Sequence, residues 1–312
     1  MSGGAWQRLG LALSAQSQRP WMASHTQMPY AEAVEGTVVR VYFTSRDAAN
    51  RSHIGWFVFD LERPGEVLDL AIEPLMAPGP AGHFDDAGIM SSWMVREAGR
   101  RRFYVIGWNV PTSVPMHISI GLAEGPGDGP PSIETRLPGP ILDRNPSDPF
   151  YVSTPCVLRD GKTWRMWYLS GLEWAWREGR AHSRYDVRHA VSPDGVAWTP
   201  EPQPVLALGA GEVAIARPMV LRDPDVWRMW CCYRGESFGY RIGYAESDDG
   251  RAWRRMDDHP LALAPGGADF DRQMACYPYV FDHGGERWML YCGDGFGQAG
   301  LGLARLNRGP AP

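Results

Sequence analysis

The chain has 312 residues, of which 12% are aromatic and 21% charged, with 14 tryptophans and a formal net charge of −5. This composition supports a packed core and excludes a disordered chain. No run of Lys and Arg predicts a nucleic-acid groove or a membrane surface, and no apolar stretch approaches the ~20 residues of a membrane span.

The N-terminal residues and the cysteines favour a reduced, cytoplasmic protein. Residues 9–15 form a short apolar run preceded only by Arg8, which makes a poor secretion signal. The five cysteines have no framework spacing. Cys231 and Cys232 should point to opposite faces of a strand, and the histidines lack metal-ligand spacing. We therefore expect free thiols and neither a metal site nor a cofactor.

In chain order, five predicted hairpins follow one another. Two weaker hairpins cover residues 29–43 and 93–106. Three nearly identical ones follow at 154–167, 217–230 and 277–291, each with an apolar run, a turn containing Gly or Pro, and an aromatic run. Their marker prolines, Pro155, Pro218 and Pro278, lie 63 and 60 residues apart, which leaves room for four strands in each unit.

Further strands follow each hairpin. A third strand starts near residues 54, 120, 188, 242 and 301. A fourth follows Ser-x-Asp-Gly turns at 192–198 and 247–253, where Asp can bond backbone N–H groups and Gly permits positive φ. The last unit stops after its third strand, and residues 5–10 resemble 252–257. We expect this N-terminal strand to complete the last unit and leave no open sheet edge.

These units predict an all-β fold with one domain over residues 1–312. We expect a five-bladed β-propeller with four-stranded antiparallel blades, its ring closed by the N-terminal strand joining the last blade. A β-sandwich is the alternative, but it explains neither five similar units nor the displaced strand.

The repeats resemble the five-bladed propellers of the arabinanase, invertase and levansucrase clan and of the related mannoside phosphorylases. The shared pattern is Pro-x-Val-x-x-x-Gly-x-x-x-x-Met-Trp-Tyr followed by Ser-x-Asp-Gly-x-x-Trp, and the chain looks closest to uncharacterised glycosidase-like propellers. Further shared segments are 84–89, Glu212, 232–234 and 276–279. The resemblance implies a central funnel with a sugar-like ligand. Glycosidases of the clan place an Asp early in the first inner strand, but residues 24–29 contain no carboxylate here.

In such propellers the funnel mouth is lined by residues before each innermost strand and in the loop after the second strand. The residues expected there to bind substrate are His25, Arg46, Trp108, Trp174, Arg217, Arg234, Glu236, Asp271, Tyr277 and Asp294. Aromatic rings stack on sugar C–H faces, and carboxylates accept hydrogen bonds from hydroxyl groups. The alternative for the tryptophans is that they cap the propeller.

Arginines in this set suggest an anionic ligand. Arg46, Arg217 and Arg234 could converge on a carboxylate or phosphate group. Because neighbouring antiparallel strands bring their ends together, we expect Glu212, Arg217, Arg234 and Glu236 on one funnel wall. The alternative is an internal ion-pair network among these four residues.

Three carboxylates are candidate catalytic residues, because glycosidic cleavage uses paired acidic groups. Glu212 leads as general acid, since it breaks the register of the repeat. Asp86 or Glu173 is the expected second carboxylate, although Asp86 shares its repeat position with Asp148 and Asp271, as turn or capping residues do. The alternatives are a solvated Glu212 and a Glu173 paired with a nearby arginine.

The sequence thus predicts a carbohydrate-active enzyme that cleaves or transfers a glycosyl unit on a polar sugar-containing small molecule, with an anionic substrate allowed by the arginines. Two alternatives stay open: a sugar-binding propeller without turnover, and a biosynthetic enzyme that uses the funnel for isomerisation or cyclisation. No nucleotide fingerprint or nucleophile elbow is present. We expect neither nucleic acid nor membrane as a partner.

Overall fold

The computed structural model describes residues 4–14 and 19–307, which form antiparallel strands and one short helical turn, α1 (Asp294–Gly297). By antiparallel pairing the strands fall into five groups of four, and single parallel bridges join the first group to the second and the third to the fourth. The first contains β2 (Ser24–Glu35), β3 (Val38–Arg46), β4 (Ser52–Asp60) and β5 (Val67–Leu70). The second contains β6 (Gly88–Glu97), β7 (Arg100–Asn109), β8 (His117–Pro126) and β9 (Thr135–Arg136).

The remaining groups repeat this order. The third contains β10 (Val152–Asp160), β11 (Thr163–Arg177), β12 (Arg180–Ser192) and β13 (Thr199–Pro200). The fourth contains β14 (Glu212–Asp223), β15 (Val226–Gly235), β16 (Arg241–Ser247) and β17 (Arg254–Arg255). The last contains β18 (Cys276–His283), β19 (Glu286–Cys292), β20 (Leu301–Asn307) and β1 (Ala5–Leu13).

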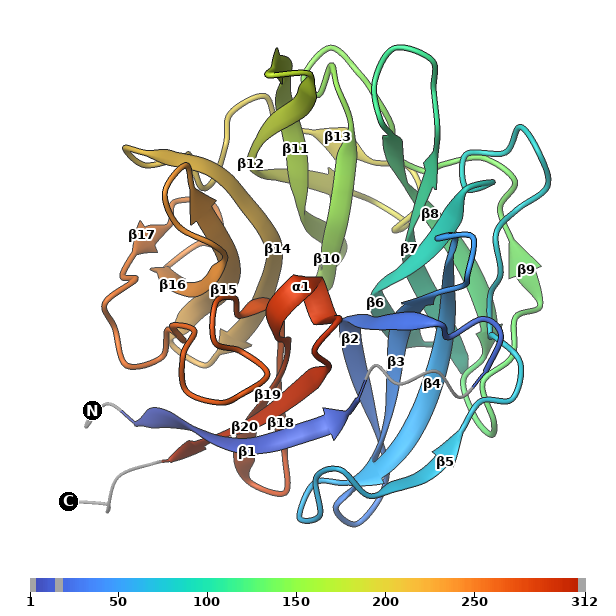
Figure 1. Ribbon diagram of the computed structural model, residues 1–312, viewed down its shortest axis with the longest axis vertical. Helices are drawn as coiled ribbons and strands as arrows, with labels where there is room; N and C mark the ends of the chain where they lie inside the picture. The colour runs from blue at the N-terminus through green and yellow to red at the C-terminus, as the bar shows by residue number, and fades with distance from the viewer. Residues whose placement is uncertain (1–3, 15–18, 308–312) are drawn as a thin grey trace.

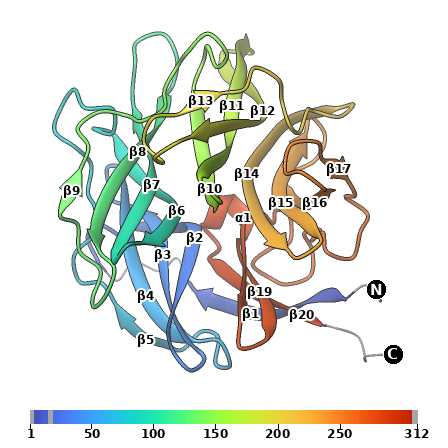
Figure 2. The same cartoon turned by 180° about the vertical axis from the view of Figure 1, so that it is seen from behind.

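The first strand of each group lies at the centre of the molecule. β2 contacts β6, β6 contacts β10, β10 contacts β14, β14 contacts β18, and β18 contacts β2. Figures 1 and 2 show the groups around this common centre, with α1 close to it. Residues before and within these five strands therefore face one another across the centre.

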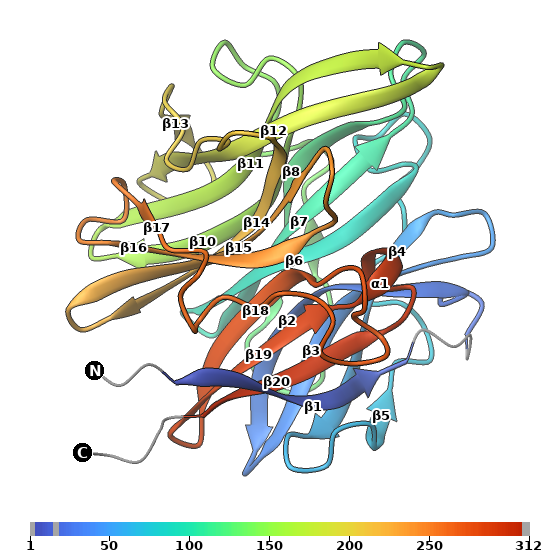
Figure 3. The same ribbon diagram turned by 60° about the vertical axis from the view of Figure 1, so that its left-hand side comes forward.

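The N-terminal strand pairs with the last strand of the chain. β1 runs antiparallel to β20, and Figure 3 shows the two side by side. The Trp6 indole N–H donates to the carbonyl of Leu261 at 2.7 Å, and Arg8 forms a 2.7 Å ion pair with buried Asp271. These contacts fix β1 against the chain's C-terminal third.

The two Ser-x-Asp-Gly turns form the bonds expected from their sequence. Ser192 Oγ accepts a hydrogen bond from the Gly195 N–H at 2.9 Å, and Asp194 Oδ1 accepts from Val196 N–H at 2.8 Å. The second turn repeats these bonds with Ser247 and Asp249. The glycines at 195 and 250 have φ of +77° and +73°, a conformation open to glycine at little cost.

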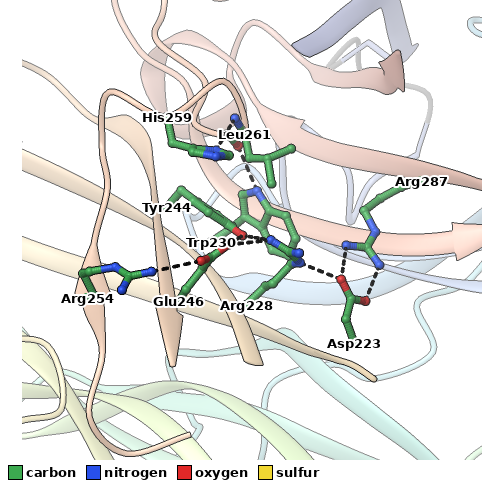
Figure 4. A network of polar contacts seen from close by, with 9 residues as sticks. All are labelled: Asp223, Arg228, Trp230, Tyr244, Glu246, Arg254, His259, Leu261 and Arg287. Atoms are coloured by element: carbon green, nitrogen blue, oxygen red, sulfur yellow. Dashed lines mark hydrogen bonds and ion pairs between the residues drawn. The ribbon is translucent and has the colours of Figure 1, made fainter. Parts of the chain in front are cut away.

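A polar network joins the fourth group to the last (Figure 4). Arg228 donates to Asp223 and Glu246, each at 2.6 Å, and also to the hydroxyl of Tyr244. Arg287 on β19 donates to Asp223 at 2.7 Å and to Asp282. Arg287 is buried and Arg228 is partly exposed, and each guanidinium group thus faces carboxylates; we call this set the outer network.

The state of the cysteines and the length of the helices were the remaining structural features expected from the sequence. All five cysteines are buried and free. Within residues 4–14 and 19–307 no helix has the length and apolar character needed to cross a membrane.

Candidate functional site

Each innermost strand has a bulge at the same repeat position. The register shifts lie between Gln27 and Tyr30, Met90 and Trp93, Ser153 and Cys156, Ala216 and Met219, and Cys276 and Tyr279. At four of these bulges the residue before proline has positive φ: Met28 (53°), Thr154 (45°), Arg217 (53°) and Tyr277 (53°). Such a conformation costs ~1–3 kcal/mol, and bulges redirect side chains next to sites. The bulge repeated in each innermost strand therefore changes the direction of the side chains around the centre of the molecule.

A cavity of about 390 Å³ lies where the five bulges meet; we call it the funnel cavity. Its aromatic lining consists of Trp108, Tyr151, Tyr185, Tyr240, Tyr277 and Phe296. Polar lining residues are Gln27, Arg46, Asn50, Ser153 and Thr154. In the part of the chain that the structure describes, no Asp or Glu belongs to this lining.

The polar lining residues have hydrogen-bond partners for only some of their donor and acceptor atoms. Arg46 donates to Asn50 Oδ1 at 2.8 Å, and no carboxylate among the described residues lies within ion-pair distance of it. Gln27 is 1% exposed and its side-chain N–H donates to the Phe296 carbonyl at 2.6 Å. The Gln27 Oε1 atom has no hydrogen-bond partner among the described residues. Gln27 Oε1 can accept a hydrogen bond from a ligand, and the Arg46 guanidinium can donate one.

Two tyrosines of the lining share a cation. The hydroxyl groups of Tyr185 and Tyr240 are hydrogen-bonded to each other. The Arg234 guanidinium carbon lies 5.9 Å from the Tyr185 ring centroid and 5.6 Å from the Tyr240 centroid. Burial acts to lower the pKa of Arg234, but the two phenols outweigh it and raise the pKa. Arg234 thus stays charged behind the cavity wall.

Arg217 is buried at the centre without lining the cavity. Its guanidinium donates to the carbonyl and hydroxyl of Ser92, both at 2.7 Å, and to the carbonyl of Pro29 at 2.9 Å. Burial lowers its pKa to about 10. These bonds tie the innermost strands of three groups together, so Arg217 first serves the fold and adds positive charge near the cavity.

His25 follows Ser24, which pairs with Arg46, but it is not part of the funnel lining. Its Nδ1 lies 2.8 Å from Ser24 Oγ. Burial, and then the charge of Arg46, lower the pKa of His25 to about 4. The imidazole is therefore neutral at neutral pH.

Glu212 lies in an ion pair outside the funnel lining. Its carboxylate accepts two 2.8 Å hydrogen bonds from Arg255 and one at 2.7 Å from the Gly209 N–H. Burial acts to raise the pKa of Glu212, but these bonds outweigh it and lower the pKa. A general acid near neutral pH needs a raised pKa, so this environment disfavours that role.

The expected four-residue wall forms in the backbone but not in the side chains. Glu212 pairs with Gly235, and the Glu236 N–H donates to the Gly211 carbonyl. The Glu236 carboxylate, however, lies 3.3 Å from Arg177, whereas Glu212 binds Arg255. The alternative network among Glu212, Glu236, Arg217 and Arg234 is also absent among the described ion pairs.

The two other candidate carboxylates line different cavities. Asp86 lines a second cavity of about 450 Å³ together with Trp174 and His117, and accepts a hydrogen bond from the Gly82 N–H at 2.8 Å. Glu173 lines a third cavity of about 390 Å³ with Arg234 and Glu236, and lies 3.8 Å from Arg184. The structure does not place this pair in one cavity.

Asp271 and Asp294 hold loops. Asp271 is buried and accepts hydrogen bonds from Arg8, from the Tyr291 hydroxyl at 3.0 Å and from the Ala268 N–H at 2.7 Å. Asp294 accepts from the backbone N–H groups of residues 273 and 274. Of the residues expected to bind substrate, Arg46, Trp108 and Tyr277 line the funnel cavity.

Sequence reasoning missed Tyr185 and Tyr240, although the repeat marks them. Ile54, Ile120, Val187 and Ile242 occupy equivalent bridge positions on the third strands. Of the residues two places earlier, 118, 185 and 240 line the funnel cavity, whereas Ser52 does not. The start of the third strand in the second, third and fourth groups was the signal that the predicted lining left out.

Within the described residues no cluster of three or more His, Cys, Asp or Glu side chains could hold a metal ion. No protein-family model matches the chain.

Solved structures share the fold. A glycoside hydrolase aligns with a TM-score of 0.75 at 18% identity, covering 99% of this chain and 95% of the other. A thermostable family-43 glycoside hydrolase gives 0.65 at 15% identity, covering 92% and 91%. A structure from the GH130 family of mannoside phosphorylases gives 0.66 at 14% identity, covering 99% and 96%. At these identities the similarity shows the fold, which is that of glycoside hydrolase-like propellers.

Two curated sequences are much closer. They are the uncharacterized proteins Rv1502 and MT1551 of Mycobacterium tuberculosis, strains H37Rv and CDC 1551. Each is 41% identical over 304 residues, covering 97% of this chain and 99% of the relative. Since the identity extends over nearly the whole fold, the chain belongs to the family of these mycobacterial proteins.

Proposed function

We propose that this protein is a carbohydrate-active propeller that holds an anionic, sugar-containing small molecule in its funnel cavity. The five strand groups would be five blades of one domain, with β1 closing the ring, and the compartment would be the cytoplasm. The observation that carries the proposal is the lining of the funnel cavity: six aromatic rings and Arg46, with no carboxylate among the described lining residues.

The lining suits a sugar. Six rings offer faces for sugar C–H groups, and the unpartnered Gln27 Oε1 can accept a hydrogen bond from a hydroxyl group. Ser153 and Thr154 add hydroxyl groups at the bulge of β10. A volume of about 390 Å³ falls in the usual range of small-molecule sites.

The charges suit an anion. Arg46, Arg217 and Arg234 surround the cavity, and none forms an ion pair with a described carboxylate. A buried charge without a counter-ion is costly, and an anionic ligand would supply the missing charge. The same argument disfavours a neutral sugar as the full ligand.

The positions of the three candidate carboxylates bear on which type of reaction the funnel cavity could support. Glycosidic cleavage by paired carboxyl groups needs them ~5 to ~9 Å apart around the scissile bond. Glu212 is bound by Arg255, while Asp86 and Glu173 line separate cavities. The funnel cavity therefore favours sugar binding or non-hydrolytic chemistry, such as isomerisation or cyclisation.

Glycosyl cleavage or transfer is the second candidate, and one observation favours it. Trp174, which lines the second cavity with Asp86, packs against Tyr151 of the funnel cavity with ring centroids 5.5 Å apart. A ligand extending past Tyr151 would bring a glycosidic bond near Asp86.

Calorimetric titration with glucuronate, glucose 1-phosphate and glucose tests the proposal. At least one of the acidic sugars should bind more tightly than glucose. Arg46→Met should weaken that binding ~10-fold or more, the worth of one charged hydrogen bond. Arg63→Met is the matched control, because Arg63 is exposed and paired with Asp60 and Glu66. Binding of none of these sugars would refute the proposal.

A second experiment separates the two reactions. NMR spectra of wild-type protein with oligosaccharides that end in an acidic sugar would show released monosaccharide if glycosyl cleavage occurs. If release is seen and Asp86→Asn abolishes it, the second candidate is correct. A new signal from a rearranged sugar would instead support non-hydrolytic chemistry.

A further inference from the structure

One wall of the funnel cavity contains polar groups that the fold does not require. Residues 118, 185 and 240 occupy the same repeat position, yet the second group has Ile118 there and packs well with an apolar side chain. The third and fourth groups have Tyr185 and Tyr240, whose hydroxyl groups meet. Because the position tolerates isoleucine, the phenols call for an explanation other than packing.

Arg234 adds a charge to this pair. It lies on β15, opposite Ala214, with its guanidinium over both rings at 5.9 and 5.6 Å. No described carboxylate lies within ion-pair distance of it, although Glu173 and Glu236 line the cavity on its other side. The cation is thus directed to the phenols and not to an acidic side chain.

The three side chains form a strong donor toward a ligand oxygen. Two phenols have two O–H groups, and their mutual hydrogen bond uses one of them. The other is left to donate. A guanidinium beside the phenol oxygens polarises that O–H group, and such charge-assisted donors are roughly twice as strong as neutral ones.

We propose that Tyr185, Tyr240 and Arg234 form the subsite that binds the oxyanion of the ligand, a carboxylate or a phosphate attached to the sugar. This rests on the proposed function, because it assigns a place to the anionic group within the same cavity. The wall continues from Tyr240 to Tyr277, whose ring centroids lie 6.4 Å apart, and Tyr277 shares the cavity lining with Arg46. The sugar ring would then lie beside Trp108 and Tyr277; Phe296 already stacks on Tyr277, with ring centroids 6.2 Å apart.

Phenylalanine substitutions test the subsite, because they remove the hydroxyl groups and keep the rings. Calorimetry would compare wild type, Tyr185→Phe, Tyr240→Phe and the double variant, with Tyr104→Phe as the matched control. Tyr104 is buried outside the funnel lining, and its hydroxyl donates to the Gly195 carbonyl at 3.0 Å. The double variant should bind the acidic sugar ~10- to 100-fold more weakly and glucose unchanged, while the control binds both like wild type.

The probes separate the two sources of oxyanion. Loss confined to glucuronate identifies a carboxylate, and loss confined to glucose 1-phosphate and inorganic phosphate identifies a phosphate. Wild-type binding of an acidic sugar with no loss in the double variant would overturn the subsite and leave the proposed function intact. Absence of any sugar binding by wild type would refute both.

Arg234 acts through the phenols, so its effect should depend on them. Arg234→Met should weaken acidic-sugar binding in the wild-type background and have no further effect in the Tyr185→Phe/Tyr240→Phe background. Equal losses in both backgrounds would show that Arg234 acts independently and would contradict its assigned place in the subsite.

Discussion

Arginines in two regions of the molecule have opposite surroundings. In the outer network, Arg228 and Arg287 each donate to two carboxylates (Figure 4). Around the funnel cavity, Arg217 donates to backbone carbonyls and a serine, and Arg234 lies over tyrosine rings. The arginines of the outer network therefore have carboxylate counter-charges, whereas Arg217 and Arg234 have none within ion-pair distance among the described residues.

The same comparison applies to the candidate carboxylates, which can be either paired with an arginine or left without one. Glu212 and Asp271 resemble the outer network, because each is bound by an arginine and by a backbone N–H group. The position of these two carboxylates before the innermost strands therefore reflects loop structure. The comparison predicts that substitutions in the two regions respond differently to pH and to ligand.

The largest effect is expected at Arg217. Arg217→Ala should lower the free energy of unfolding by ~4 kcal/mol, because acceptors on Ser92 and Pro29 lose their donor and a cavity remains. Urea unfolding measures the loss. Arg217→Met keeps most of the volume and should lose less. Since no carboxylate is involved, the loss should not change between pH 7 and pH 4; a loss below ~1 kcal/mol would contradict the bridging role.

Arg287→Ala should cost ~2 kcal/mol at pH 7, and here the loss should depend on pH. Burial acts to raise the pKa of Asp223, but hydrogen bonds from Arg287 and Arg228 outweigh it and lower the pKa. A carboxyl with a lowered folded pKa stabilises the fold above its unfolded pKa and loses that effect as pH falls through the folded pKa. The difference between variant and wild type should therefore shrink below pH ~4. A pH-independent loss, like that at Arg217, would remove the contrast.

The fold was predictable because its signals are local. The Ser192 and Ser247 turns complete their hydrogen bonds within a few residues, and the hairpin pattern repeats in every unit. Strand order then follows from short connections. Even the displaced β1 was recognisable, since its Ala-Trp start resembles the fourth strand of another unit.

The site was harder to predict because side-chain partners are set by distant segments. Glu212 is neutralised by an arginine 43 residues later, and Asp271 by one 263 residues earlier. Register alone shows that Glu212 is unusual, not which residue binds it. Tyr185 and Tyr240 meet through their hydroxyl groups although 55 residues separate them. A repeat alignment extended to the third strands would have identified both as lining residues, but not their contact with Arg234.

The Glu212→Gln variant tests whether Glu212 serves the fold through its ion pair with Arg255 or takes part in catalysis. With its bonds to Arg255 weakened, the variant should lose ~1 kcal/mol of stability at pH 7 in urea unfolding, and less at acidic pH because the folded pKa of Glu212 is lowered. Its affinity for an acidic sugar should stay within about twofold of wild type, since Glu212 does not line the funnel cavity. A large loss of affinity or turnover with unchanged stability would return Glu212 to the site.

The smallest effect is a shift in the titration of His25, which reports directly on the unbalanced charge. Burial and Arg46 lower its pKa from 6.5 to about 4, so the folded state binds fewer protons than the unfolded chain between these values. His25 therefore contributes stability above pH ~6.5 that is lost as pH falls toward ~4. Arg46→Met should raise the pKa of His25 only part of the way, because burial is the larger cause. A bound anion should raise it too, by offsetting Arg46. NMR titration of the His25 ring protons, with and without an acidic sugar, measures both shifts. If neither Arg46→Met nor a bound acidic sugar moves the pKa, Arg46 does not govern the potential at His25, and the contrast between the two regions weakens there.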